Sequence, residues 1–150
     1  MRKITILISL ASLLLFLSTT VWAAGTKEQA EAMVKKAIAF YKANGKEKAF
    51  AEISNTKGKF VKGELYVFVY DMNGKCVAHG FNNKLIGVDL IEMRDPDNTF
   101  FVKERIKLVK EKGKGWQDYK YTNPTTKKME SKTAYVEKID NYVFGCGVYK

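Results

Sequence analysis

The stretch ELYVFVYDMNGKCVAHG, residues 64–80, contains the pattern that decides the fold. From Glu64 to Tyr70 the side chains alternate between two faces, and both faces are apolar, one aliphatic and one aromatic. A strand that is apolar on both faces is typical of the centre of a sheet covered on both sides. Asp71–Gly74 ends in Asn-Gly, which tolerates the positive φ of a tight turn, and Lys75–His79 then returns as a second strand. The segment therefore predicts the central hairpin of an antiparallel sheet.

Helical segments are predicted before this hairpin. Apolar residues recur there at three- and four-residue steps with charged residues between them, which is the period of an amphipathic helix. The residues of this stripe are Ala30, Met33, Val34, Ala37, Ile38 and Tyr41. Asn44 and Gly45 stop the helix, and a shorter helical piece with Ala49, Phe50 and Ile53 on one side follows.

Another helix and three strands are predicted after the hairpin. The turn residues Asp95–Asn98 open an amphipathic helix from about Thr99 to Lys112, which Gly113 ends. Alternating apolar patterns predict strands over 116–122, 129–139 and 142–149. The chain is therefore expected to have an α+β fold. Its five-stranded antiparallel sheet, long N-terminal helix and helix-containing crossover between strands two and three form the topology of PAS-like sensor domains.

The N-terminus has the pattern of a cleavable signal peptide. Arg2 and Lys3 precede a short apolar run, which Ser18 and two threonines close. The run is short for a membrane-spanning helix, which needs about 20 apolar residues. Val21 and Ala23 place small side chains at the positions that a signal peptidase reads, so we predict cleavage after Ala23. Residues 1–23 are then the signal peptide and residues 24–150 one domain in the periplasm or outside the cell. A retained signal anchor is the alternative.

The chain is strongly basic. It has 26 basic and 16 acidic residues, and the predicted signal peptide carries two of the basic ones, which leaves a formal charge of +8 on the mature domain. Export removes such a chain from nucleic acid, the usual partner of a basic protein inside the cell. The lysines are scattered along the sequence, which favours a solvated surface over one binding arm. A weaker inference is that this positive field concentrates small anions.

The sequence offers no constellation for catalysis or metal binding. His79 is the only histidine, so a His-rich metal site is excluded and a catalytic triad would depend on this residue alone. Neither Ser54 nor Ser131 lies in a Gly-x-Ser-x-Gly elbow. The two cysteines form neither a redox nor a haem-attachment motif. We therefore expect a protein that is not an enzyme and that carries no cofactor.

The sequence resembles the single Cache domain of type 2 over nearly all of residues 28–150. The residues that carry this resemblance are ELYVFVYDMNGKCVAHG (64–80), LIGVDL (85–90), GKGWQDYKYTNP (113–124), KTAYVEKI (132–139) and GCGVYK (145–150). It implies an extracytoplasmic PAS-like sheet with a pocket for a small ligand, often an organic acid. Such domains usually serve membrane-bound chemoreceptors and histidine kinases. This chain ends at Lys150 directly after its last strand, so we expect a free-standing exported version.

Two functions follow as alternatives. One is a sensor module that binds a small carboxylate-bearing metabolite and feeds signal transduction or chemotaxis through a membrane-bound receptor or kinase. The other is an adaptor domain with a vestigial pocket that docks on a membrane receptor. Only the first gains stability from a ligand, by RT ln(1 + [L]/Kd).

The cysteines of a PAS-like sheet would lie on strands with the first strand between them. Strands are about 4.8 Å apart, so Cys76 and Cys146 would be roughly 10 Å apart, which is beyond the reach of an undistorted disulfide. We therefore predict two buried free thiols. The oxidising compartment leaves a disulfide open as the alternative.

Four side chains near strand ends are candidates for the pocket wall. His79 is either a structural residue or, from its similarity to the family's Ala-His element, a ligand contact. Tyr119 and Tyr121 share one face of their strand, and we favour both for the pocket. Trp116 points to the other face and remains ambiguous.

Lys132 is the candidate anchor for the ligand. It alternates with apolar Ala134 and Val136, and burying an unpaired ammonium costs several kcal/mol, so it needs a partner. Asp118 or Glu130 could be that partner, and a ligand carboxylate is the preferred alternative. Tyr135 is a further candidate, but it points opposite Lys132 in a regular strand, so at most one of the two should line the pocket.

Overall fold

The computed structural model describes residues 24–150, and the predicted signal peptide, residues 1–23, lies outside the described residues. Two helices begin this part of the chain: α1 spans Lys27–Asn44 and α2 spans Lys46–Ile53. Thr26 caps α1 because its side chain accepts a hydrogen bond from the backbone of Gln29, whose side chain bonds back to the backbone of Thr26. Gly45 separates the helices with a φ of 80°, which favours glycine.

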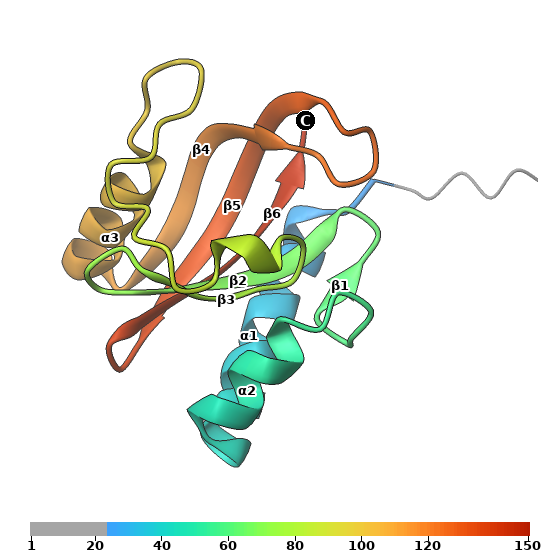
Figure 1. Cartoon of the computed structure of the whole chain (residues 1–150), viewed down its shortest axis with the longest axis vertical. Coiled ribbons are helices and arrows are strands. Elements are labelled where there is room, and N and C mark those ends of the chain that lie inside the picture. The colour runs from blue at the N-terminus through green and yellow to red at the C-terminus, as the bar shows by residue number, and fades with distance from the viewer. Residues whose placement is uncertain (1–23) are drawn as a thin grey trace, which may run out of the picture.

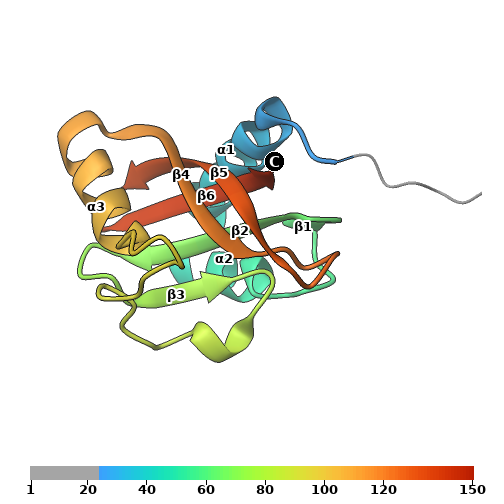
Figure 2. The same cartoon turned by 90° about the horizontal axis from the view of Figure 1, so that it is seen from above.

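An antiparallel sheet of six strands forms the centre of the described residues. The strands are β1 (Val61–Lys62), β2 (Leu65–Asp71), β3 (Cys76–His79), β4 (Lys114–Thr122), β5 (Met129–Ile139) and β6 (Tyr142–Tyr149). Strand β2 pairs with β6 on one side and with both β3 and β1 on the other, and β5 and β4 follow β6. Figure 2 shows this order from β3 across to β4.

Different layers cover the two faces of the sheet (Figure 1). Helices α1 and α2 pack on one face against the aliphatic side of β2, including Val67 and Val69. Helix α3 (Phe101–Lys112) and the loop before it cover the other face, where Tyr66, Phe68 and Tyr70 of β2 lie. Burial on both faces explains why β2 is apolar throughout, and it confirms that this strand is central.

The predicted element order is confirmed, with small differences at the ends. Strands β5 and β6 have the predicted bounds, whereas α3 begins at Phe101 rather than at Thr99. The structure also adds β1 and a short 3-10 helix, η1 (Asn83–Leu85). These elements are too short for a repeating apolar pattern, so the sequence did not indicate them.

Strand β2 separates the two cysteines, as the strand order predicted. Cys76 lies on β3 and Cys146 on β6, and both are buried free thiols. They also face opposite layers: the Sγ of Cys146 lies 3.9 Å from the Sδ of Met33 on α1, whereas Cys76 packs in the cluster beneath α3. Burial raises the pKa of both thiols to about 12, so neither is a reactive thiolate at neutral pH.

Candidate ligand-binding site

Lys132 is completely buried on the face of the sheet that α3 covers. Its Nζ donates hydrogen bonds to the Oη of Tyr66 at 2.8 Å and to the Oη of Tyr149 at 3.3 Å. Strand pairing explains the second contact, because Lys132 on β5 lies directly opposite Tyr149 on β6. The tyrosines belong to two different strands, and both hold the ammonium through neutral hydroxyls.

No carboxylate within residues 24–150 forms an ion pair with Lys132. Asp118 and Glu130, the two acidic residues that the sequence offered as partners of Lys132, bond to other groups. Asp118 accepts from Lys150 at 2.9 Å, and Glu130 accepts from Asn123 at 2.7 Å. Burial, with a smaller contribution from the charge of the nearby Arg105, lowers the pKa of Lys132 to about 7. Within residues 24–150, Lys132 therefore has no ion-pair partner, and the charge of Glu64 acts on it only from beyond ion-pair distance.

Arg105 is a second buried cation on the same side of the sheet, 1% exposed. It comes from α3, and its Nε donates to the side-chain oxygen of Gln117 at 3.1 Å. The guanidinium carbon lies 4.4 Å from the ring centre of Phe68 and 5.0 Å from that of Tyr119. Its terminal nitrogen Nη2 is buried without a hydrogen-bond partner among the described residues.

Sequence reasoning missed Arg105, although a signal was present. The residue lies four positions after Phe101 and four before Val109, and both of these are buried. Because residues four apart share one helix face, Arg105 stands in the apolar stripe of α3. A positive charge in such a stripe needs a partner when it is buried, as Lys132 does on its strand.

His79 lies at the end of β3 and is 1% exposed. Its Nδ1 accepts hydrogen bonds from the backbone N–H groups of Phe81 at 3.2 Å and Asn82 at 3.0 Å. Burial lowers the pKa of His79 to about 3, and the charges of Lys132 and Arg105 contribute. The ring is therefore neutral, with its proton on Nε2, so it can act as a donor from that atom.

Tyr119 and Tyr121 share one face of β4, as strand parity predicted, and the pairing of Tyr119 with Lys132 places both on the same side of the sheet as Lys132. The ring of Tyr119 stacks on Phe101 with centres 5.0 Å apart. The ring of Tyr121 has its centre 5.7 Å from the Nζ of Lys132 and 6.5 Å from the ring of His79. Tyr121 therefore borders the buried polar group.

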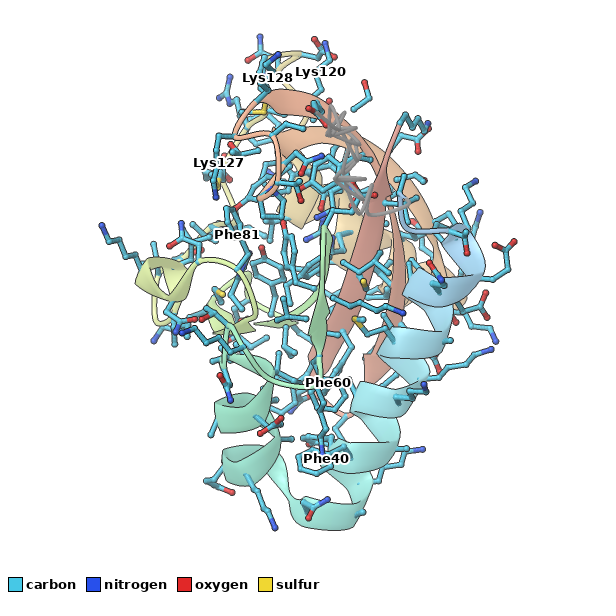
Figure 3. All side chains as sticks on the ribbon, turned by 90° about the vertical axis from the view of Figure 1, so that its right-hand side faces the viewer. Phe40, Phe60, Phe81, Lys120, Lys127 and Lys128 are labelled. Carbon is cyan, nitrogen blue, oxygen red and sulfur yellow. The ribbon has the colours of Figure 1, made fainter. Side chains whose placement is uncertain are left out.

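A cavity of about 340 Å³ opens on the outer side of Tyr121. It is lined by Phe81, Asn82, Leu85, Met93, Arg94, Asp95, Phe101, Lys120, Tyr121, Thr122 and Met129. Figure 3 shows Phe81 on the same part of the molecule as Lys127, whose Nζ lies 5.5 Å from the Phe81 ring, with Lys120 and Lys128 beyond it. A larger cavity of about 470 Å³ lies at the start of α1, and neither Lys132 nor Arg105 lines either cavity.

Trp116 and Tyr135 lie on the opposite face, away from Lys132. Their rings pack together beneath α1 with centres 5.5 Å apart. The hydroxyl of Tyr135 donates to the carboxylate of Glu137 at 2.7 Å. These two candidates therefore belong to the layer between the sheet and α1 rather than to the group around Lys132.

Two glycines of β6 make room for the group around Lys132. A Cβ on Gly147 would lie 2.6 Å from the Cε of Lys132, and a Cβ on Gly145 would lie 2.2 Å from the Phe68 ring. Both distances are shorter than any real contact of such atoms. Glycine at these two positions of β6 is therefore required for the side chains of Lys132 and Phe68 to pack over the strand.

A family model described as Single Cache domain 2 matches residues 24–150 of this sequence. The chain belongs to the single Cache domain 2 family. The match spans the whole described part of the chain, and it confirms the resemblance in the strand and turn motifs. Cache domains are extracytoplasmic ligand-binding sensor domains. Among residues 24–150, no helix has both the length and the apolar character needed to cross a membrane, and no cluster of His, Cys, Asp or Glu could hold a metal ion.

Two curated proteins are similar over 86 residues, which are 56% of this chain. The methyl-accepting chemotaxis protein McpP of Pseudomonas putida is 30% identical there, and the match covers 16% of its length. The sensor histidine kinase MctS of Rhizobium johnstonii is 33% identical, and the match covers 18%. This Cache domain therefore corresponds to less than a fifth of each relative.

Solved structures agree with the fold. A methyl-accepting chemotaxis protein of Vibrio parahaemolyticus superposes with a TM-score of 0.72 at 20% identity, covering 82% of this chain and 87% of that one. A Cache chemosensory domain described for its recognition of carboxylic acids gives a TM-score of 0.64 at 27% identity, with coverages of 81% and 86%. The α+β, PAS-like fold class is thereby confirmed, and the domain is homologous to the ligand-binding domains of chemotaxis receptors and sensor kinases.

Proposed function

We propose that this Cache domain is an extracytoplasmic sensor for a small carboxylic acid, and that Lys132 binds the carboxylate. The observation that carries the proposal is a completely buried ammonium that bonds to two tyrosine hydroxyls and forms no ion pair with a carboxylate of residues 24–150. A buried charge is costly unless it is paired, and none of the ion pairs among residues 24–150 includes Lys132. The similar Cache domain described for carboxylic acid recognition supports the same class of ligand.

The surrounding groups suit an anion. Lys132 supplies the charge, and the Nε2–H of His79 and the hydroxyls of Tyr66 and Tyr121 are donors near it. Charge-assisted hydrogen bonds of this kind are about twice as strong as neutral ones. The cavity outside Tyr121 provides the approach, and its lining includes the basic Arg94 and Lys120 together with the acidic Asp95. Movement of Tyr121 would join the cavity to the buried group.

The test is calorimetric titration of the mature domain with acetate, propionate, butyrate and succinate. The variant Lys132→Met keeps most of the apolar stem and removes the charge, so the affinity for the best acid should fall by roughly tenfold to a hundredfold. The matched control is Lys138→Met, an exposed lysine on the same strand, which should leave the affinity unchanged. Equal affinities of the wild type and Lys132→Met would exclude Lys132 as the anchor. Failure of all four acids to bind would favour the adaptor function.

We further propose that the domain is exported and processed, and that it passes its signal to a membrane-bound receptor or kinase. The relatives with these roles support the second part. For the first, we expect the intact mass of the protein in the exported fraction to be that of a chain beginning at Ala24. Recovery of only the full-length chain in the membrane fraction would show instead that the N-terminal segment is a retained anchor.

A further inference from the structure

Two buried cations and no paired carboxylate lie on one face of the described sheet. Lys132 is completely buried and Arg105 is 1% exposed. Asp95 is a buried acid in the loop that covers this face, but its oxygens accept hydrogen bonds from the backbone N–H groups of Asp97, Thr99 and Lys120. None of the described residues forms an ion pair with Lys132 or Arg105, and the charge of Glu64 acts on Lys132 only from beyond ion-pair distance.

Arg105 is fixed in place but incompletely bonded. Gln117 orients it, because the Gln117 amide nitrogen donates to the Phe101 carbonyl at 2.8 Å while its oxygen accepts from the Arg105 Nε at 3.1 Å. This arrangement uses the Nε side of the guanidinium and leaves Nη2 buried without a partner. A buried charged donor without an acceptor is costly, and it indicates a missing partner.

The two cations are close enough to share one small molecule. The Phe68 ring contacts both, with its centre 4.4 Å from the guanidinium carbon of Arg105 and 5.9 Å from the Nζ of Lys132. The sheet beneath them is lined by Gly145, Gly147 and Ala134, and the Phe68 ring and the Lys132 side chain lie directly over the two glycines, so a ligand between the cations would displace part of these side chains. The aromatic ring offers an apolar surface for a short carbon chain.

We propose that the ligand is a small dicarboxylate, with one carboxylate on Lys132 and the other on the open edge of Arg105. This inference rests on the proposed function and names its ligand class. A monocarboxylate balances one of the two charges, whereas a dicarboxylate balances both and gives Nη2 its acceptor. Arg suits the second position because its planar fork binds a carboxylate through two parallel hydrogen bonds.

The test compares succinate with butyrate, which have the same four-carbon chain and differ by one carboxylate. By calorimetric titration we expect the wild-type domain to bind succinate at least about tenfold more tightly, the effect of one charge-assisted contact. In Arg105→Met this preference for succinate should be lost. A purely structural arginine held by its aromatic neighbours would not affect the ratio of the two affinities.

Two further variants separate the possible outcomes. Lys107→Met removes an exposed charge from the same helix and should keep the preference for succinate. Lys132→Met should weaken both acids. If the wild type binds butyrate as tightly as succinate, the dicarboxylate is refuted, and a loss of butyrate affinity in Lys132→Met would then still support the proposed function. If neither succinate nor butyrate binds, both the dicarboxylate and the proposed carboxylate sensor are refuted for these acids. The wild-type comparison decides the question even if Arg105→Met does not fold.

Discussion

Without ligand at pH 7, the variant Lys132→Met should be more stable than the wild-type domain. Replacing a buried, imperfectly compensated charge by an apolar side chain of similar length is often stabilising, by about 1 to 4 kcal/mol. Lys132 fits this case because it is completely buried and burial lowers its pKa to about 7. Tyr66 and Tyr149 lose the ammonium but lie 3.4 Å from each other and can bond directly.

The effect should depend on pH with a definite sign. The unfolded lysine keeps a pKa of about 10.4, so between pH 7 and that value the unfolded chain binds a proton that the folded domain has released. The wild type therefore becomes more stable as the pH rises through this window, relative to Lys132→Met, which has no such proton. The advantage of the variant should shrink toward pH 10. Ligand binding should show the opposite trend, since a carboxylate needs the protonated lysine.

Urea unfolding at pH 7, 8.5 and 10 measures this difference, and Lys138→Met serves as the exposed control on the same strand. A Lys132→Met variant that is less stable than the wild type at every pH would identify Lys132 as a structural hydrogen-bond donor. Higher stability together with lost affinity would instead show that the domain keeps a destabilising charge for the sake of its ligand.

Gly145→Ala is expected to destabilise the domain by about 3 kcal/mol, the upper part of the usual range for overpacking. The added Cβ would lie 2.2 Å from the Cε2 of Phe68 and 3.0 Å from a methyl group of Val136. The Phe68 ring cannot easily move away, because it is 2% exposed and packs among the rings of Tyr70 and His79. The clash therefore has to be relieved by distortion of the sheet.

Urea unfolding of three variants tests the origin of this loss. Gly115→Ala is the control in the same sheet, where the new Cβ would lie 3.2 Å from the side chain of Leu108 and only a small adjustment is needed. In the double variant Gly145→Ala with Phe68→Leu, the smaller side chain should recover part of the stability lost in Gly145→Ala. Wild-type stability of Gly145→Ala would mean that Phe68 has another favourable position, and that the space above β6 is not fixed by the glycine.

The predictions for Lys132→Met and Gly145→Ala both concern the packing of side chains over β6. The domain places a long cationic side chain and a large ring across the middle of its sheet, and it keeps glycine at two positions of β6 to allow this. Residues chosen only for stability would fill that space with apolar side chains. The proposed function gives a reason for this arrangement, because an anion beside Lys132 would use the charge that the sheet buries.

The sequence by itself determined the elements and the faces of the strands. The two-sided apolar pattern of β2 and the Asn-Gly turn after it are local features, because side-chain direction alternates along any strand. The same parity separated Tyr119 and Tyr121 from Trp116 on one strand and Lys132 from Tyr135 on the next, and the register of β4 with β5 then placed Lys132 with the two tyrosines. The charge at Lys132, set between apolar positions, indicated the anchor of the proposed site, and the family resemblance added His79.

The tertiary structure alone decided what surrounds that lysine. Tyr66 and Tyr149 reach it because β6 pairs with both β2 and β5, and this pairing joins residues that are 66 and 17 positions away from Lys132. Arg105 comes from α3, whose packing on the sheet places it over Phe68. Such contacts depend on strand order and helix docking, which no periodic pattern contains, and so the absence of a carboxylate beside the two cations became visible only in the folded domain.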